Sequence, residues 1–413
     1  MSTLLPAEDG LLPAPAADAG RFRMLLILSA CVVLALTPWF SAAAVMPQLR
    51  AAWHISATTA SFLTISVQLG FVLGAIISAV TNLSDLVSPR HLIAASCLGA
   101  AATNLALNMA PDPAIAFVLR LLTGGFLAGV YPPALKLIST WFRRQRGLAL
   151  GTVIGALTLG SAAPHLIDAF GAADWRTVIV VTSAATALSG LGTLLVVRDG
   201  PYPFPRAAFD AAMIGRSFRN RGVLLATGGY LGHMWELYAM WSWLLIYARH
   251  VFANDGHLAS LLTFITIAAG APACVVAGFL ADRFGRTATT IALMTISGLC
   301  AASIGASFHG PGWLFVVISL VWGASVVADS AQFSAVITEI GDPRYVGTAL
   351  TTQLGSGFAL TAVTIWLLPV FADWLGSWQW VFLILVPGPA LGTLAMAILR
   401  RRPEAHALAG GHR

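Results

Sequence analysis

The chain has 413 residues, of which 58% are hydrophobic and only 10% are charged, and its formal net charge is +6. Soluble domains carry about 25% charged residues, so these proportions exclude an ordinary water-soluble globular protein. The arginines stand between hydrophobic runs and form no continuous basic stripe, which argues against a nucleic-acid partner.

Residues 1–22 open the chain with Ala, Pro and acidic side chains, without the basic start and apolar stretch of a signal peptide. We therefore expect a disordered cytoplasmic tail there. Twelve apolar stretches follow, each near the roughly 20 residues that cross a bilayer as a helix. Unbroken runs of this kind favour helices over membrane-barrel strands. They cover residues 24–46, 58–81, 91–110, 114–138, 147–171, 176–197, 222–249, 258–280, 288–308, 312–337, 346–371 and 379–399.

The connection between the sixth and seventh stretches is the longest, and its proline-rich start favours a linker. We expect a six-helix bundle over 23–198, a cytoplasmic linker over 199–220, a second bundle over 221–400 and a cytoplasmic tail over 401–413. If the spans alternate, nearly all arginines fall on one side. The positive-inside rule then predicts cytoplasmic termini, in a bacterial inner membrane.

The second half of the chain repeats parts of the first. Ser61–Thr64 returns as Ser260–Thr263, and Gly147–Leu150 returns as Gly347–Leu350. Half-length repeats in apolar chains are typical of transporters built from duplicated bundles, which bind their substrate where the halves meet. The predicted fold is an all-α membrane protein of twelve transmembrane helices in two pseudo-symmetric six-helix bundles.

Residues 278–287, between the eighth and ninth spans, resemble the signature of the major facilitator superfamily. The matching positions are Gly278, Asp282, Arg283, Gly285 and Arg286. The first half has a weaker copy that keeps Asp85 and Arg90. Short glycine turns let two helices approach closely, and an aspartate there can accept from a helix N-terminus or an arginine. We expect these residues to form a cytoplasmic gate.

A second part of the resemblance is Arg120 four residues before Gly124, early in the fourth span. The family fold implies that spans 1, 4, 7 and 10 line a central cavity. Ionisable groups inside spans are costly and mark functional positions. Such groups are Arg120 and Lys136 in span 4, Glu236 in span 7 and Asp329 in span 10, and all of them fall on the cavity-lining spans. Lys136, the only lysine, lies near a span end, and we expect it to snorkel.

Helical phase groups polar and aromatic residues into stripes on these spans, and we expect the stripes to face the cavity. The expected substrate-binding residues are Arg120, Tyr131, Trp39, Met240, Trp243, Trp322 and Gln332. The expected proton-coupling residues are Glu236, His233 and Asp329.

Each buried charge leaves an alternative open. Arg120 suits a carboxylate and lies at a depth where it could face Glu236, but it could instead bond helix carbonyls and staple the first bundle. Glu236 and His233, one turn apart, could share a proton or form a fixed pair. Asp329 could instead hold a polar contact to Ser325 or Gln332.

No phosphate-binding loop of the Gly-x-x-x-x-Gly-Lys-Ser/Thr kind is present, and no cysteine pair has metal-ligand spacing. We therefore expect no enzyme, no cofactor and no metal, but a monomeric secondary transporter coupled to protons. Arg120 favours a small organic anion such as a carboxylate as the solute. The alternative is a proton-driven efflux antiporter for amphipathic drugs or metabolites.

Overall fold

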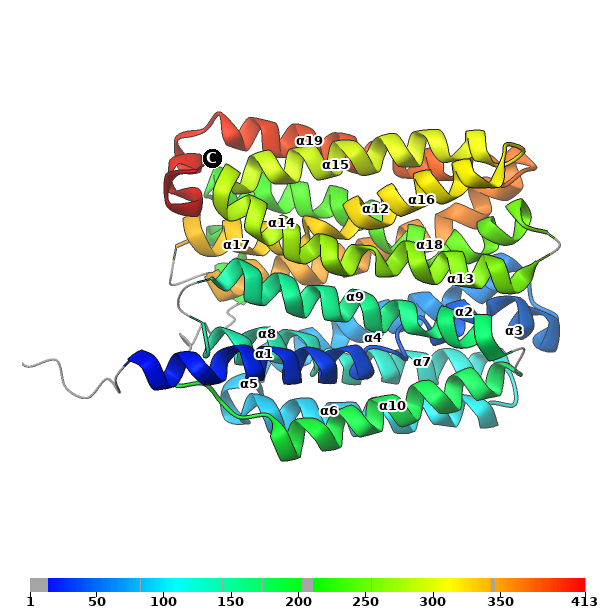
Figure 1. Ribbon diagram of the computed structural model, residues 1–413, viewed down its shortest axis with the longest axis horizontal. Helices are drawn as coiled ribbons and strands as arrows, with labels where there is room; N and C mark the ends of the chain where they lie inside the picture. Colours follow the sequence, from blue (N-terminus) through cyan, green and yellow to red (C-terminus); the bar gives the residue numbers. More distant parts are fainter. Residues whose placement is uncertain are drawn as a thin grey trace, which may run out of the picture.

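The structure is a computed structural model that describes residues 14–81, 83–142, 145–171, 174–202, 211–253, 255–342 and 346–412. Throughout these ranges the ordered elements are helices, and no strand occurs among them. The long helices run side by side along the longest axis of the molecule (Figure 1). This confirms the predicted all-α fold.

The helices begin and end close to the predicted spans. The first half contains α1 (Ala14–Ala35), α2 (Ser41–Ala44), α3 (Met46–Trp53), α4 (Ala57–Val80), α5 (Leu83–Leu86), α6 (Pro89–Ala106), α7 (Pro113–Leu127), α8 (Tyr131–Ser139), α9 (Arg146–Gly171) and α10 (Trp175–Val196). The second half contains α11 (Ile214–Ser217), α12 (Arg221–Val251), α13 (Gly256–Ala268), α14 (Gly270–Phe284), α15 (Arg286–Ser303), α16 (Gly312–Ala328), α17 (Ser330–Ile340), α18 (Val346–Leu375) and α19 (Pro387–Arg400). Short 3₁₀ turns include η4 (Val381–Leu385) and η5 (Pro403–Gly411).

Within the described ranges, ten helical segments are long and apolar enough to cross a membrane. They correspond to predicted spans 2 to 6 and 8 to 12. The remaining two predicted spans correspond to α1 and α12, which lie alongside the others (Figure 1). The structure is therefore consistent with the predicted count of twelve.

Several spans are broken near their middle. The first span ends as a regular helix at Ala35, ahead of Pro38, and resumes as α2. The fourth is divided between α7 and α8, where two prolines follow Tyr131 at the start of α8. Proline lacks an N–H and is favoured in the first turn of a helix, which is consistent with both breaks. The tenth span breaks at Asp329, between α16 and α17.

The helices pack into two groups that follow the two halves of the chain. In the first half α4 packs on α7, α6 on α10 and α1 on α9; in the second, α12 and α15 pack on α19 and α14 packs on α16. The groups meet along two seams, α9 against α13 and α14, and α4 against α18. In Figure 1 α9 lies directly beside α13 and α14.

Glycines let the first seam close tightly. A Cβ atom added to Gly151 would lie 2.7 Å from the carbonyl oxygen of Cys274, and one added to Gly155 would lie 2.6 Å from that of Ala271. Any larger side chain would therefore push α9 away from α14. Small residues allow close helix packing in membranes in this way.

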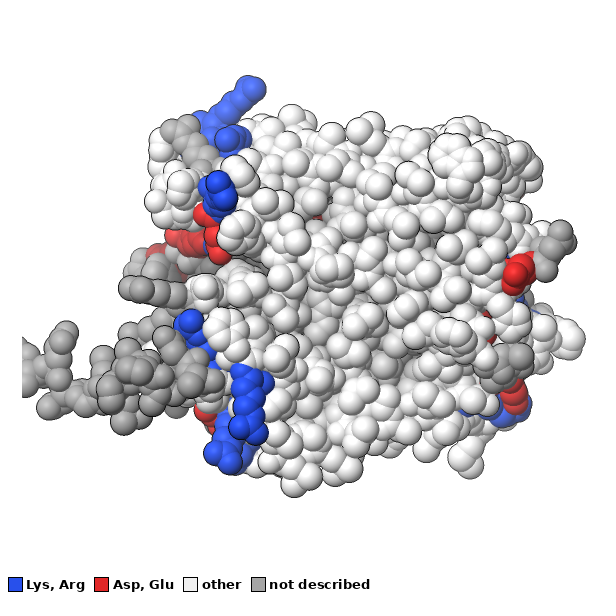
Figure 2. Space-filling view, in the orientation of Figure 1, with Lys and Arg blue, Asp and Glu red and all other residues white. Residues whose placement is uncertain are grey.

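Exposed charged side chains are scarce around the middle of the surface seen in Figure 2. Figure 2 shows a broad belt without charge, with Lys and Arg gathered at the end where the C-terminus lies. Large apolar side chains are exposed on the helices, among them Leu26 (69%), Leu195 (79%) and Trp313 (65%). Such a surface suits contact with lipid, as predicted, because soluble monomers rarely expose large contiguous apolar patches.

The C-terminal segment differs from the loose tail expected over 401–413. Residues 403–411 form η5, with Ala405 and Leu408 fully buried. The Ala409 N–H donates to Glu339 Oε2 over 2.9 Å, which fixes the segment to α17. At the other end, α1 begins at Ala14, inside the range expected to be a tail, while residues 1–13 lie outside the described part.

Candidate functional site

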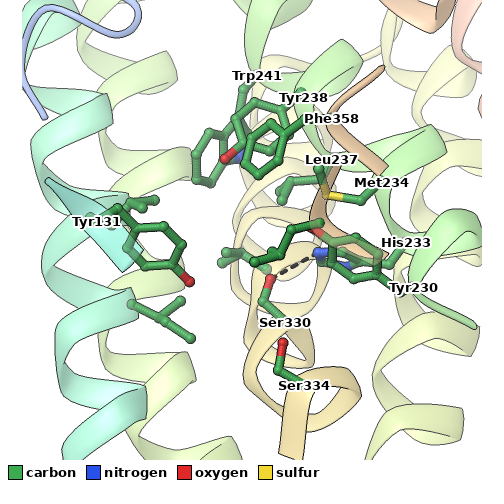
Figure 3. Close-up of a pocket in the computed structure, with 14 residues that line it drawn as sticks. Tyr131, Tyr230, His233, Met234, Leu237, Tyr238, Trp241, Ser330, Ser334 and Phe358 are labelled. Atoms are coloured by element: carbon green, nitrogen blue, oxygen red, sulfur yellow. Dashed lines mark hydrogen bonds between the residues drawn. The ribbon is translucent and has the colours of Figure 1, made fainter. Parts of the chain in front are cut away.

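A small cavity lies between the two groups of helices, with a volume of about 40 Å³. A water molecule needs roughly 10–15 Å³ by this measure, so the cavity has room for a few waters. Tyr131 at the start of α8 lies on one side, and α12 supplies most of the opposite wall (Figure 3). Ser330 and Ser334 of α17 complete the polar part of the lining. An organic solute would fit only after the two groups move apart.

His233 is the ionisable group at the edge of this cavity with a charged neighbour. Its Nδ1 lies 2.9 Å from Asp329 Oδ1, and both side chains are almost fully buried. Its Nε2 lies 2.8 Å from Ser330 Oγ (Figure 3). Asp329 reaches His233 because the break between α16 and α17 falls at that residue. The sequence singled out both residues, but it paired His233 with Glu236 instead.

Glu236 lies one turn further along α12 and has its own partners. Ser297 Oγ–H donates to Oε2 over 2.9 Å, and Trp322 Nε1–H donates to Oε1 over 2.7 Å. Its side chain is buried, and it does not line the cavity. In this structure Ser297 and Trp322 are the hydrogen-bond partners of the Glu236 carboxylate, while His233 contacts Asp329. Trp322, expected to bind substrate, instead holds this carboxylate.

Arg120 is fully buried within the first group of helices. Its guanidinium donates to the carbonyl oxygens of Trp39 (2.6 Å), Pro38 (2.9 Å) and Leu63 (3.3 Å). It also donates to Asn104 Oδ1 (2.9 Å) and Ser41 Oγ (3.2 Å). The Pro38 and Trp39 carbonyls belong to the break between α1 and α2, and the Leu63 carbonyl belongs to α4, so the guanidinium joins these elements to α7. Arg120 therefore does not face Glu236, and its geometry matches the alternative in which it staples the first bundle.

Of the other residues expected to bind substrate, some line the cavity and some do not. Tyr131 lines the cavity. Trp243 donates its indole N–H to the Ile365 carbonyl over 2.9 Å, and Gln332 Oε1 accepts from Arg286 Nη1 over 2.9 Å. Met240 is fully buried in the core. Among these three, none lines the cavity in this structure.

Sequence reasoning missed most of the cavity wall because it followed the stripe of α12 that carries Glu236, Met240 and Trp243. The wall uses a different face of α12, which is apolar and aromatic. Spacing by three and four residues marks this face, so a helical-phase signal was present in the sequence. The missed residues include Tyr230, Met234, Leu237, Tyr238, Trp241 and, from α18, Phe358.

Six aromatic residues join the two groups of helices beside the cavity, and we call them the aromatic plug: Trp39, Phe40, Phe71, Tyr238, Trp241 and Phe358. Ring centroids lie 4.4 Å apart for Phe71 and Phe358 and 5.7 Å apart for Trp39 and Phe358. Those of Phe40 and Trp241 are also 5.7 Å apart. Each of these pairs joins the first half of the chain to the second.

The signature segment forms a charged cluster at the end of the seam. Arg286 Nη1 lies 3.0 Å from Asp282 Oδ1, and Arg286 Nη2 lies 2.8 Å from Glu339 Oε1. A Cβ atom added to Gly147 would lie 2.7 Å from Asp282 Oδ2, so this carboxylate sits against the start of α9. An anion at a helix N-terminus is stabilised there. Asp282 thus touches the first group of helices, as a gate would require.

The other residues expected to form the gate lie in or near turns between helices. Gly285 has φ of 100°, a left-handed conformation that favours glycine, and it joins α14 to α15. A Cβ atom added to Gly278 would lie 2.8 Å from the Gly147 carbonyl oxygen. Arg283 points over the Phe284 ring, with Cζ 5.4 Å from the centroid. Arg90 lies at the start of α6, while the side chain of Asp85 lies outside the described residues.

At the opposite end of the same seam, Asp168 of α9 contacts the second group of helices. Ser260 Oγ–H donates to its Oδ2 over 2.6 Å, and Arg249 Nη2 lies 3.5 Å from the same oxygen. The sequence gave no sign of this contact, because it depends on how the two halves dock. A carboxylate of one group of helices therefore lies against the other group at both ends of the seam.

The family model of the Major Facilitator Superfamily matches residues 28–350 and, in a second match, 227–413. The puromycin resistance protein of Streptomyces alboniger is 30% identical over 201 residues, which is 47% of this chain and 39% of that protein. An MFS-type transporter of Gibberella moniliformis is 26% identical over 283 residues, 62% of this chain and 65% of that protein. Human monocarboxylate transporter 11 is 31% identical over 182 residues, 40% of this chain and 36% of that protein. The chain thus spans less than two thirds of each of these relatives.

Two solved structures have a similar fold over almost the whole chain. A bacterial homologue of the human lysosomal transporter Spinster, in an inward-facing and unoccupied conformation, superposes with a TM-score of 0.66 at 14% identity, covering 97% of this chain and 98% of that chain. The proton:xylose symporter XylE superposes with a TM-score of 0.70 at 14% identity, covering 92% of this chain and 96% of that chain. At this identity the likeness concerns the fold alone.

Proposed function

Because this chain belongs to the Major Facilitator Superfamily, we propose that it is a monomeric secondary transporter that moves a small organic solute across a membrane in exchange for protons. The two groups of helices alternate between openings at either end of the seam, as duplicated bundles do around a central site. The contacts of Asp282 and Asp168 with the opposite group supply the closing interactions at the two ends.

The buried pair of His233 and Asp329 carries the proposal of proton coupling. With a proton on His233 the pair is neutral overall. Without that proton Asp329 leaves a negative charge in a nearly dry interior, which is costly. The empty site therefore takes up either a proton or a cationic group. Such a choice between two cations is what exchange of a solute for a proton requires.

The cavity lining supports an amphipathic solute, so we place the efflux alternative first. Apart from His233 and the hydroxyl groups, the described lining is apolar or aromatic. The expectation of an anionic solute depended on Arg120. In this structure the Arg120 guanidinium donates its hydrogen bonds to groups of the first bundle. The similarity to a puromycin resistance protein supports the same choice.

A small carboxylate stays the second candidate. The segment similar to monocarboxylate transporter 11 favours it. A protonated His233 at the edge of the cavity could pair with a carboxylate, and Ser330 could donate a further hydrogen bond. In that case proton and solute would move together.

Purified protein in liposomes with a pH difference and no nucleotide tests the proposal. We expect puromycin to move against the proton flow, with no ATP requirement. Lactate serves as the carboxylate probe, and its movement along with protons would select the second candidate. A pH difference that moves neither probe in wild-type protein, while ATP does move one, would contradict the proposal.

We also propose that the end carrying Asp282 faces the cytoplasm, in a bacterial inner membrane. Lys and Arg gather at that end (Figure 2), which the positive-inside rule assigns to the cytoplasm. A cysteine placed at Gly410 should resist a membrane-impermeant thiol reagent in intact cells and react after lysis. Reaction in intact cells would reverse the orientation.

A further inference from the structure

The aromatic plug is made by both halves of the chain and holds them together in this structure. Trp39, Phe40 and Phe71 come from the first group of helices, and Tyr238, Trp241 and Phe358 come from the second. Trp39 also lies near Tyr238, with ring centroids 5.9 Å apart. When the two groups separate, these rings lose one another as partners. Aromatic faces then stand opposite each other across the opening.

The plug is continuous with the cavity. Tyr238, Trp241 and Phe358 line the cavity as well as belonging to the plug (Figure 3). Any solute that occupies the cavity and passes toward the Asp168 end of the seam must therefore meet these rings. No charged side chain belongs to the plug, so the rings and their polar atoms decide what is accepted.

Two indole N–H groups in the plug differ from those of neighbouring tryptophans. The side chains of Trp39 and Trp241 are only 1% and 0% exposed, and within the described ranges neither Nε1 has a hydrogen-bond partner. Neighbouring tryptophans do have one. Trp235, Trp243 and Trp322 donate to the Ile384 carbonyl, the Ile365 carbonyl and Glu236, all within 2.9 Å.

Buried donors without a partner are costly, and each such group in a native protein calls for an explanation. Packing alone does not supply one here, because phenylalanine would fill a similar space without the unpaired N–H. A ligand with hydrogen-bond acceptors supplies the missing partners. A ligand with a flat ring also restores the stacking that the plug loses when it opens, and stacking contributes beyond simple burial.

We propose that the aromatic plug is the specificity site of the transporter and selects planar aromatic solutes that carry a hydrogen-bond acceptor. The ring inserts between the rings of the two halves, and the acceptor takes the N–H of Trp241, Trp39 or both. This inference rests on the proposed function only in that the two halves separate around a solute. The proposed solute class does not depend on which ion is coupled to transport.

A matched pair of neutral compounds tests the proposal without reference to protons. 2-Naphthamide has a flat ring and a carbonyl acceptor, and its decahydro derivative keeps the carbonyl but has no aromatic ring. Binding of both to purified protein in detergent, at one fixed pH, is measured by ligand-dependent thermal stabilisation and by calorimetry. We expect wild-type protein to bind 2-naphthamide at least about tenfold more tightly than the saturated compound.

Two variants of Trp241 separate the ring from its donor. Trp241→Leu should bring the ratio between the two compounds to within about threefold. Trp241→Phe keeps a ring, so it should retain the ring preference but bind 2-naphthamide several-fold more weakly than wild type. Trp366→Leu is the control on the same helix as Phe358; its side chain is 40% exposed, and the ratio should stay unchanged.

Equal binding of the two compounds by wild-type protein would overturn the proposal, and so would binding of neither. A Trp241→Leu protein that is folded and keeps the tenfold ratio would overturn it too. Because no gradient is applied, ring selection can stand even if proton exchange fails. Conversely, gradient-driven transport of a solute without a ring would leave the proposed function intact and sink this inference alone.

Discussion

Replacing Arg120 tests whether it is a structural staple or a ligand for the solute. The guanidinium donates to five acceptors that all belong to the first group of helices. Glutamine retains one donor group and is shorter. Leaving about two of the acceptors unsatisfied costs about 1–3 kcal/mol each, so Arg120→Gln should lose about 2–6 kcal/mol of unfolding free energy.

The assay is chemical unfolding of the purified protein in detergent, followed by helical circular dichroism. Arg176→Gln is the matched control, because Arg176 forms an exposed ion pair with Asp174 at 3.2 Å. Exposed pairs contribute at most about 1 kcal/mol, so the control should be close to wild type. The affinity for puromycin, measured at a temperature where both variants are folded, should stay within about threefold.

The reasoning would be refuted by the opposite pattern. If Arg120→Gln unfolds like the control but binds solute about a hundredfold more weakly, a loss of 2.7 kcal/mol, then Arg120 belongs to the site. Arg120→Lys refines the result. Lysine keeps the charge but not the planar fork, so we expect an intermediate loss of stability.

Three further perturbations address the gate, the seam and the C-terminal segment. Asp282→Asn should slow solute flux in liposomes while affinity stays within a few-fold; a hundredfold loss of affinity would place Asp282 in the binding site. Gly151→Val should reduce flux strongly, because the added atoms would lie within contact distance of the Cys274 carbonyl, whereas Gly215→Val, where the structure leaves open space, should transport normally. Truncation after Arg402 should lower the unfolding free energy by about 1.5–3 kcal/mol, since it removes the fully buried Leu408, and unchanged stability would contradict the packing of η5.

The helices were predictable because residues close to each helix end in the sequence determine where the helix stops. Apolar runs end at charged, glycine or proline residues, and the ends of α6, α9, α10 and α12 lie within a few residues of prediction. The C-terminal segment was not predictable in this way. Its burial depends on how the segment packs against the end of α17, and no periodic pattern in residues 403–411 indicates that contact.

The site residues were only partly predictable because helix rotation is a tertiary property. The sequence identified His233, Glu236 and Asp329 as buried ionisable groups, and all three are buried. It could not show that a break at Asp329 would turn this carboxylate toward His233. Nor could it show that the break around Pro38 would bring the carbonyls of Pro38 and Trp39 to Arg120.

The central claim is that the pair of His233 and Asp329 exchanges a proton for the solute, and solute-induced proton movement tests it most directly. Wild-type protein is reconstituted in liposomes with an entrapped pH-sensitive dye, without a gradient and without nucleotide, and puromycin is added outside. We predict that protons leave the liposome interior as solute enters, and that Asp329→Asn gives no proton signal when puromycin is added. Solute entry without any change of internal pH in the wild-type protein, or an unchanged proton signal in Asp329→Asn, would contradict the claim.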